Sequence, residues 1–461
     1  MLNIRALEQR IEDVMRQGRI PGLALTLVKD ADVIYARGFG VTSVEDGGLP
    51  VTPQTLFRLG SNTKPLTTTA VMRLVEQGKL DLDRKITDYI PWFALRKAGA
   101  ADHVTLRLLL SHMAGLPEGP AAYNGRRDPQ GLEAQVRVDI AQYPLVAPPG
   151  TLYSYSNLGV NLAGYVAETV SGQPFPDLMQ SLVFDPLEMC RTTFDPTVAM
   201  TYPLAQAHDL QADGALRVYH DPGDNTANYP GAFAMSTALD LANFMIMLMQ
   251  QGRFGDQQIL SPRSVSTMHT PHADLYLDSG LHYGLTWDLE MYKGIRRVFH
   301  EGGYKTVGSK IILAPDAHVA AVLLYNRDHD FVETRDATLN LMFDQLLDLT
   351  QECPSLPPVE PDRSLWPRYT GSYSRVFEMA EATIRVVDDQ LTLEFHGALV
   401  PLTARTPHLY TGPTPGYKDQ NVAWQRIRHF KSKTVSVGFL PEPAGPTRYL
   451  MMNARPYKRV R

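Results

Sequence analysis

Apolar positions near the start of the chain follow the spacing of an amphipathic helix. They stand three or four residues apart and predict a helix over residues 3–17, which Pro21 and Gly22 end. Two aliphatic and β-branched runs, residues 23–28 and 33–36, flank a polar cluster and predict a hairpin. The helical positions are Ile4, Leu7, Ile11 and Val14.

Helical spacing dominates the middle of the chain, and strand-like runs return from Val298 onward. The predicted helices include residues 62–78, 158–170 and 238–250. Apolar runs at 308–313 and 319–324 predict a second hairpin, and residues 332–347 predict a closing helix. We therefore expect one antiparallel sheet built from both ends of residues 1–350, with an all-helical lobe inserted at roughly 85–230.

A proline-rich segment separates this part from the end of the chain. Residues 351–362 hold four prolines, which stiffen a linker and prevent helix or ladder formation. Beyond it, short strands alternate with turns and predict an all-β, barrel-like module over 363–461. The predicted fold is α/β (α+β): a sheet domain flanked by helices with its helical lobe at 1–350, the linker, and the β-module. The strands predicted for the module include residues 382–387, 391–395, 423–429 and 434–439.

The charge balance excludes several kinds of partner. The chain has 461 residues with 44 basic and 49 acidic side chains, a formal net charge of −5. This composition offers no basic field for nucleic acid or for an anionic membrane. A small-molecule or short-peptide substrate is the expected ligand, and the oligomeric state stays open.

The N-terminus bears on targeting, and the cysteines and one histidine pair bear on metal binding. The first fifteen residues carry several charges, unlike a secretory signal, so the sequence as written predicts a cytoplasmic protein. A periplasmic or secreted location would apply if a leader has been removed. Cys190 and Cys353 match no paired metal spacing, and His269 and His272 lack a third ligand. We expect no metal and no other cofactor.

Ser61 and Lys64 are the clearest candidates for nucleophilic chemistry. They stand at the mouth of a predicted helix, where residues i and i+3 share one face, so the Lys64 amine can approach Ser61 Oγ. The helix N-terminus adds a positive end. Ser61 as an ordinary helix cap is the alternative. The chain has no Gly-x-Ser-x-Gly elbow, so a base would have to come from elsewhere.

Two further segments offer polar groups to the same site. Tyr155 and Asn157 alternate in an extended turn and can face one way, although a core tyrosine is the alternative. Residues 298–303 form an edge-like strand that ends in two glycines, which permit close approach of a substrate and free N–H donors for an oxyanion. A bulge with a surface histidine is the alternative there.

The ordered motifs serine-x-x-lysine, tyrosine-x-asparagine and histidine-x-glycine resemble those of the penicillin-recognising serine hydrolases. The match is best with the branch that contains class C β-lactamases, β-lactamase-type esterases, D-aminopeptidases and D,D-peptidases. The resemblance covers roughly residues 5–350, including segments 78–83, 105–116 and 236–238. It implies a sheet domain, an all-helical lobe and an active site between them.

The resemblance also implies a role for each candidate residue. Ser61 would be the acylated nucleophile, Lys64 its activating partner and Tyr155 the general base that relays protons. Asn157 would orient Lys64, and the N–H groups of Ser61 and Gly303 would form the oxyanion hole. The order in which Lys64 and Tyr155 carry the proton stays open. The substrate-binding residues would be Asn157, His300, Glu301, Gly302 and Gly303.

The third motif departs from the β-lactamase pattern. Lysine-threonine-glycine is usual there, and this chain has His300, Glu301 and Gly302. A carboxylate at Glu301 would repel the carboxylate of penicillin-type substrates, unless it points to solvent. We therefore expect a serine hydrolase that acts through an acyl-enzyme on small esters or on amides and short peptides. The alternatives are a β-lactamase or D,D-peptidase, an acyltransferase, and a non-catalytic penicillin-binding-like sensor.

Overall fold

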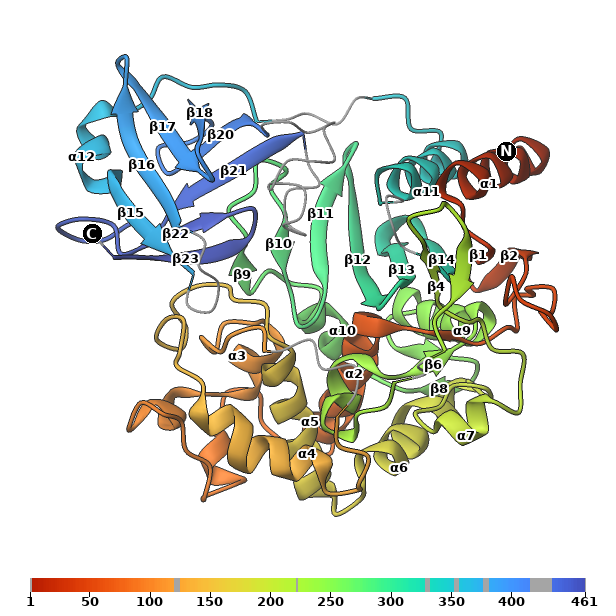
Figure 1. Cartoon of the computed structure of the whole chain (residues 1–461). Coiled ribbons are helices and arrows are strands. Elements are labelled where there is room, and N and C mark those ends of the chain that lie inside the picture. Colours follow the sequence, from red (N-terminus) through yellow and green to blue (C-terminus); the bar gives the residue numbers. More distant parts are fainter. Residues whose placement is uncertain are drawn as a thin grey trace.

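Strands that are far apart in the sequence form one eight-stranded antiparallel sheet (Figure 1). The computed structural model describes residues 2–119, 125–220, 223–327, 332–351, 356–375, 381–414 and 433–460. The order of the strands is β2-β1-β14-β13-β12-β11-β10-β9. Their bounds are β1 Gly22–Lys29, β2 Asp32–Gly40, β9 Ala273–Asp274, β10 His282–Tyr283, β11 Asp288–Tyr292, β12 Ile295–Tyr304, β13 Val307–Ala314 and β14 Val319–Tyr325. The predicted sheet assembled from both ends is thus confirmed.

Helices cover both faces of this sheet. Ile312 of β13 packs with α1 (Ile4–Gly18) and α11 (Val332–Leu347) on one face. Its neighbour Ile311 joins the core formed with α9 (Ala238–Met249) on the other. Successive side chains of a strand point to opposite faces, so a strand covered on both sides reads as a continuous apolar run. This is why β13 and β14 could be predicted from sequence.

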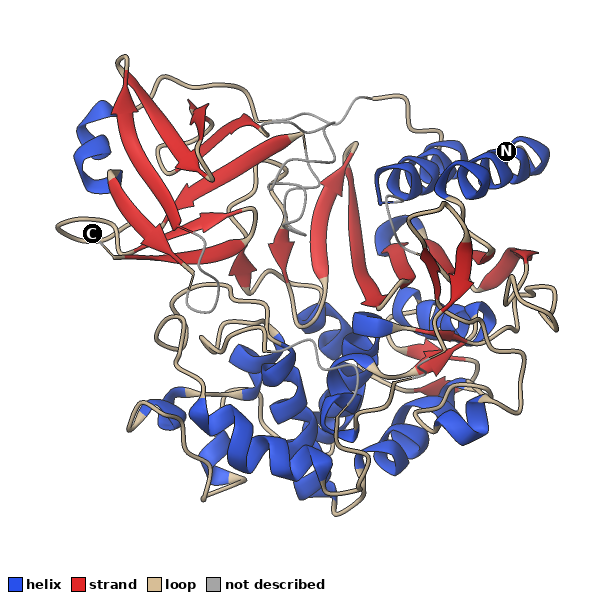
Figure 2. Cartoon of the chain, viewed as in Figure 1, coloured by secondary structure: helices blue, strands red, loops and turns tan. Residues whose placement is uncertain are grey.

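In the described part of the sequence, most helices lie between β2 and β9. Figure 2 shows many helices gathered below the main sheet. Except for α7, they share one continuous core with the α9 face of the sheet, and this core contains α2, the helix that carries Lys64. Their bounds are α2 Thr63–Glu76, α3 Leu106–Leu110, α4 Gly131–Ala134, α5 Asn157–Ser171, α6 Phe175–Met179, α7 Pro196–Ala199, α8 Tyr229–Ala232 and α10 Pro262–Met268. Short strand pairs accompany them: β3 Phe57–Arg58 with β6 Met235–Ser236, β4 His208–Leu210 with β5 Leu216–Val218, and β7 Arg253–Phe254 with β8 Gln257–Gln258.

Three strands of the main sheet were not predicted. β9 and β10 are only two residues long, and β11 carries the charged residues Asp288 and Glu290. Such short or charged segments lack the apolar alternation on which strand prediction depends. They form the end of the sheet beside β12, where the candidate active-site residues lie.

The last part of the chain forms a separate near-barrel, called the C-terminal β-module below, with nine strands in its described residues. Its order is β18-β17-β16-β15-β23-β22-β21-β20-β19, around a core of its own. The bounds are β15 Gly371–Ser374, β16 Glu381–Val387, β17 Gln390–Phe395, β18 Ala398–Pro401, β19 Thr403–Ala404, β20 Leu409–Pro413, β21 Thr434–Phe439, β22 Tyr449–Met452 and β23 Arg455–Arg459, with α12 Trp366–Tyr369 before them. The predicted all-β module is confirmed. The strand predicted at 423–429 lies outside the described residues, and the domain boundaries stay a prediction.

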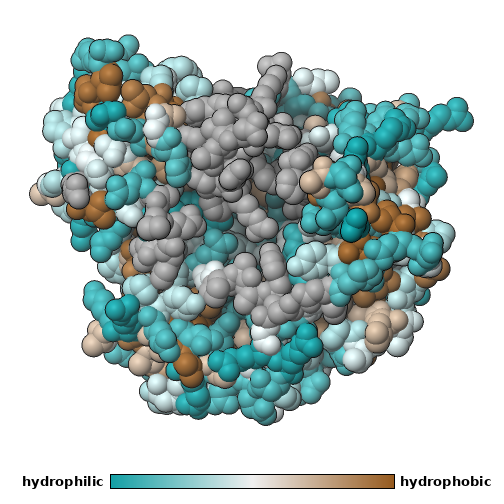
Figure 3. Space-filling view, viewed as in Figure 1, coloured by the Kyte–Doolittle hydropathy of each residue, from teal (hydrophilic) through white to brown (hydrophobic). Residues whose placement is uncertain are grey.

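The β-module packs against the rest of the molecule through a mixed cluster. Tyr449 and Met451 of the module are buried in one cluster with Tyr153 and Tyr283, and the partly buried Tyr155 packs against this cluster. On the face in Figure 3, the described surface is mainly hydrophilic with scattered apolar patches. Within the described ranges, no helix is long and apolar enough to cross a membrane.

Candidate active site

Ser61 and Lys64 meet where a short 3-10 turn, η1 (Gly60–Asn62), runs into α2. Lys64 Nζ lies 2.9 Å from Ser61 Oγ, and the Lys64 side chain is fully buried. Asn62 anchors the turn to the sheet, since its amide donates to Ser309 Oγ (2.7 Å), which donates to the Leu59 carbonyl (2.6 Å). The nucleophile candidate is therefore held rigidly between α2 and β13.

Tyr155 and Asn157 approach this pair from the start of α5. The Tyr155 hydroxyl donates to Ser61 Oγ at 2.7 Å, and Asn157 Oδ1 accepts from Lys64 Nζ at 2.7 Å. Between them, Ser156 faces the other way and caps α5, where its Oγ accepts from the Gly159 N–H (3.0 Å). The alternation expected from the sequence thus brings both side chains to Ser61 and Lys64.

The hydrogen bonds of Lys64 indicate how its amine is oriented. Besides Ser61, Nζ contacts the Asn157 amide oxygen and the Gly231 carbonyl oxygen (2.6 Å), and both of these can only accept. In a neutral amine they take the two N–H groups, so the lone pair points at Ser61 Oγ. Burial lowers the pKa of Lys64 to about 7, against the opposing charge of Glu118. Lys64 is thus placed to accept the Ser61 proton.

Burial shifts the pKa of Tyr155 in the opposite direction to that of Lys64. Burial raises the pKa of its phenol above the usual value, although the hydrogen bond with Ser61 lowers it in part. A phenol that keeps its proton can donate it to Ser61 Oγ in the 2.7 Å contact. The environment therefore favours Lys64 as the first proton acceptor. The general-base role that the resemblance implies for Tyr155 stays a prediction.

His300 faces the same region from β12 and is neutral. Its Nδ1 lies 2.7 Å from the Glu301 carbonyl, which can only accept, so Nδ1 carries the proton. Its Nε2 then accepts from the Tyr283 hydroxyl at 3.2 Å. Burial, and next the charge of Lys64, lower the pKa of His300 to about 3. His300 therefore brings no positive charge to the site.

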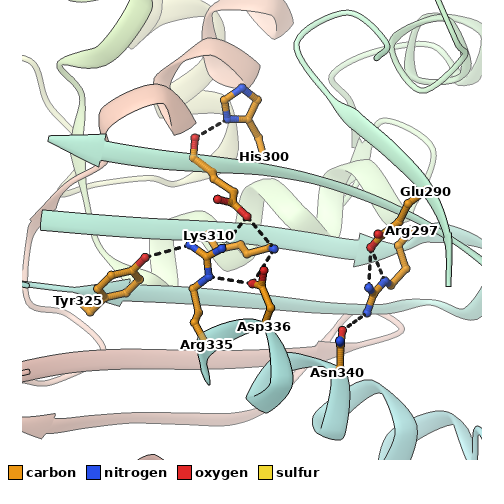
Figure 4. Close-up of polar contacts among 9 residues, drawn as sticks. Glu290, Arg297, His300, Lys310, Tyr325, Arg335, Asp336 and Asn340 are labelled. Carbon is orange, nitrogen blue, oxygen red and sulfur yellow. Dashed lines mark hydrogen bonds and ion pairs between the residues drawn. The ribbon is translucent and has the colours of Figure 1, made fainter. Parts of the chain in front are cut away.

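Glu301 does not line the site, which corrects the prediction that its carboxylate meets the substrate. Glu301 and Lys310 stand opposite each other on β12 and β13, on the face covered by α11. In Figure 4, Lys310 lies on this face with Arg335 and Asp336, whereas His300 points to the other face. Glu301 Oε1 accepts from Lys310 Nζ (2.9 Å) and from Arg335 Nη2 (2.6 Å). Its charge is neutralised there, so it neither repels a substrate nor points freely to solvent.

The two glycines at the end of β12 have different surroundings. A Cβ at Gly302 would overlap the Leu59 carbonyl oxygen, so this glycine lets η1 pack against the strand. This differs from the expected contact with substrate. Gly303 is exposed, and a Cβ added at Gly60 would lie 2.5 Å from the Gly303 nitrogen. The backbones beside Ser61 and at Gly303 therefore adjoin, as an oxyanion hole needs.

Other residues at the site were not among the predicted site residues, although His112 was interpreted from the sequence as a buried histidine at a helix end. His112 is buried directly after α3, its Nδ1 accepts from the Ser156 N–H (3.2 Å), and its ring lies 4.5 Å from that of Tyr155. Tyr283 comes from the unpredicted β10, and Gly231 acts through its carbonyl, which leaves no side-chain signal. The position of His112 in a segment typical of the resembled family was the one available clue.

Metal binding has little support in the described part of the chain. It holds no group of three or more His, Cys, Asp or Glu side chains placed to share an ion. His269 packs edge-on against Trp287, and His272 Nε2 bonds the Thr267 carbonyl at 3.0 Å. These two histidines therefore have separate local contacts.

Comparison with known proteins places the chain among relatives of one family. The family model described as Beta-lactamase matches residues 7–343. Protein flp of Staphylococcus aureus (strain N315) is 25% identical over 328 residues, which cover 71% of this chain and 64% of that protein. The chain thus spans a little under two thirds of this curated relative. Unguisins hydrolase ungD' of Aspergillus campestris (strain IBT 28561) is 26% identical over 453 residues, 92% of this chain and 79% of that protein. The crystal structure of SurE has a TM-score of 0.76 at 24% identity and covers 99% of this chain and 98% of SurE, which supports the fold.

Proposed function

The chain belongs to the beta-lactamase family, and on that premise we propose that it is a serine hydrolase that forms an acyl-enzyme with small esters or with amides and short peptides. The contact of Ser61 Oγ with both Lys64 Nζ (2.9 Å) and the Tyr155 hydroxyl (2.7 Å) carries this proposal. A binding protein would need no such set of proton-transfer groups around one hydroxyl. Unguisins hydrolase ungD', which matches 92% of this chain, is named a hydrolase, which supports the same class.

Acylation follows from the orientation of these groups. The lone pair of Lys64 takes the hydroxyl proton while Ser61 Oγ attacks the carbonyl carbon of the substrate. The N–H groups of Ser61 and Gly303 stabilise the negative oxygen that forms. When the bond to the leaving group breaks, Tyr155 gives that group its phenolic proton. The products of this step are acyl-Ser61, a Lys64 ammonium and a Tyr155 phenolate.

Deacylation reverses the proton transfers. Water gives a proton to the Tyr155 phenolate and attacks the acyl carbon. The tetrahedral intermediate then expels Ser61 Oγ, which recovers its proton from Lys64. The enzyme returns to its first state and releases a carboxylic acid.

The substrate preference is supported by His300, since Glu301 faces away from the site. His300 stands where β-lactamases of the resembled branch have a lysine, and it is neutral, with both ring nitrogens engaged. A neutral group there offers no charge attraction to the carboxylate of a penicillin or cephalosporin. Neutral esters and amides do not need that attraction, so we propose that they are preferred.

Covalent labelling tests the proposed function. We expect a fluorophosphonate to add one adduct to the wild-type protein by intact mass and none to Ser61→Ala. In a panel of p-nitrophenyl esters, D-aminoacyl amides and a chromogenic cephalosporin, an ester or amide should turn over fastest. An unlabelled wild type, or an adduct that persists in Ser61→Ala, would refute the mechanism. A cephalosporin rate equal to the best ester rate would refute the preference.

The pH dependence should follow the protonation of Lys64. Below its pKa of about 7 the ammonium has no lone pair for the Ser61 proton, so kcat/KM for a neutral ester should rise with pH and level off above about 7. Initial rates between pH 5 and 9 measure this. The exposed Lys79→Met variant should keep the same profile. A wild-type profile that is flat, or that falls across this range, would contradict the role of Lys64.

A further inference from the structure

The C-terminal β-module reaches the active site through one hairpin. Strands β22 and β23 are joined by Asn453 and Ala454, both with positive φ, as a tight hairpin turn requires. In Figure 1 these strands lie on the side of the module that faces α3. Tyr449 and Met451 of β22 pack in the cluster that also contains Tyr153 and Tyr283. The first residue of β23 therefore comes close to the segment that carries Tyr155.

That first residue is Arg455, and it brings a positive charge to Tyr155. Its guanidinium carbon lies 5.6 Å from the centre of the Tyr155 ring. Its Nη1 donates to Glu118 Oε2 at 3.1 Å, and its side chain is 18% exposed. The Glu118 carbonyl in turn accepts from the Asn157 N–H at 3.1 Å. An ion pair between the module and the loop after α3 thus stands directly beside the proposed catalytic residues.

Several titratable groups surround Tyr155, but few keep a full charge. Burial first, and then the charge of Lys64, lower the pKa of both His112 and His300, so both rings are neutral. Burial raises the pKa of Asp288 well above its ordinary value, which weakens its negative charge. Burial likewise raises the pKa of Tyr153 and Tyr283 well above the ordinary value, so both phenols stay neutral. Within the described residues, the groups that interact with Tyr155 apart from Lys64 are Ser61, His112, Glu118, Tyr153, Tyr283, Asp288 and Arg455. Among the residues that the structure describes, Glu118 and Arg455 remain as opposed charges at this position.

On the basis of the function proposed above, we propose that the C-terminal β-module completes the active site: Arg455, anchored by Glu118, favours the deprotonated form of the Lys64 and Tyr155 pair. A nearby cation disfavours an ammonium and stabilises a phenolate. It therefore favours loss of a proton from both Lys64 and Tyr155. A carboxylate at the same place acts in the opposite sense. Arg455 acts through Tyr155 and Lys64 and is a positioning residue.

The opposed charges permit a test that separates electrostatics from structure. Arg455→Gln and Glu118→Gln break the same ion pair, so a merely structural role predicts the same change for both. The proposal predicts opposite shifts. The acidic limb of kcat/KM should move up by about one pH unit in Arg455→Gln and down by a similar amount in Glu118→Gln. Arg455→Lys keeps the charge and should restore most of the wild-type profile.

The experiment uses the full chain and an uncharged p-nitrophenyl ester between pH 5 and 9. Matched controls are Arg385→Gln and Glu394→Gln, which break an exposed 2.9 Å pair within the module and should leave the limb in place. Shifts in the same direction for the Arg455 and Glu118 variants, or no shift in either, would overturn the proposal. If Arg455→Gln does not fold, the proposal is tested by the downward shift of the acidic limb in Glu118→Gln and by the pH profile of Arg455→Lys.

Fluorophosphonate labelling of Ser61 in each variant separates this proposal from the proposed function. An unlabelled wild type refutes the serine hydrolase. Labelled variants whose acidic limbs stay at the wild-type pH refute the role of Arg455 alone.

Discussion

Replacement of Ser61 by alanine should lower kcat/KM for an activated ester by about 10⁴- to 10⁶-fold. Ser61 Oγ is the atom that both Lys64 Nζ and the Tyr155 hydroxyl contact, so its removal leaves both without a group to act on. The oxyanion-hole N–H groups remain, and they account for a residual rate above that of water. Initial-rate assays on purified protein, with intact mass to exclude wild-type contamination, measure the loss.

A second serine provides the control for this substitution. Ser171 ends α5, and its hydroxyl donates to the Glu168 carbonyl at 3.1 Å, away from the candidate site. Ser171→Ala removes only local hydrogen bonds at a helix end, so its activity should stay within about twofold of wild type. If Ser61→Ala kept more than a hundredth of the wild-type activity, Ser61 would not be the nucleophile.

Local periodicity was sufficient to identify the first two pairs of site residues. Ser61 and Lys64 share a face because they stand one helical turn apart, and Tyr155 and Asn157 do so because they alternate in an extended segment. More than ninety residues separate the two pairs, so their contact depends on the tertiary structure. Only the resemblance to a known family implied that contact. Arg455 could not be found in this way, because its approach depends on how the β-module packs.

Glu301 shows where reasoning by proximity along the chain fails. It follows His300 directly, and sequence proximity suggested that both meet the substrate. In a strand, however, consecutive side chains point to opposite faces. Once His300 faces the site, Glu301 must face α11, where Lys310 and Arg335 neutralise it. The same alternation that correctly paired Tyr155 with Asn157 therefore separates His300 from Glu301.

The network around Glu301 should be important for stability, and replacement of Arg335 by methionine should lower the free energy of unfolding by about 2–4 kcal/mol. The Arg335 side chain is 2% exposed and bonds Glu301 (2.6 Å), Asp336 (2.9 Å) and the Tyr325 hydroxyl (3.1 Å) (Figure 4). Its loss leaves two carboxylates to share Lys310 alone. The side chains of Glu301 and Asp336 are 40% and 36% exposed, so water screens part of the cost. Urea unfolding followed by tryptophan fluorescence measures the change.

The dependence of this loss on pH identifies its electrostatic origin. Burial alone would raise the pKa of Glu301, but the charges of Arg335 and Lys310 lower it below its ordinary value. The carboxylate therefore contributes stability above its unfolded pKa, and that contribution is lost as pH falls through the lower folded pKa. The gap between wild type and Arg335→Met should thus be full at pH 7 and should narrow below about pH 4. Arg296→Met, which breaks an exposed 2.9 Å pair with Asp316, should cost less than about 1 kcal/mol at either pH. If the two variants were equally stable at pH 7, the Glu301 network would contribute no more than a surface ion pair.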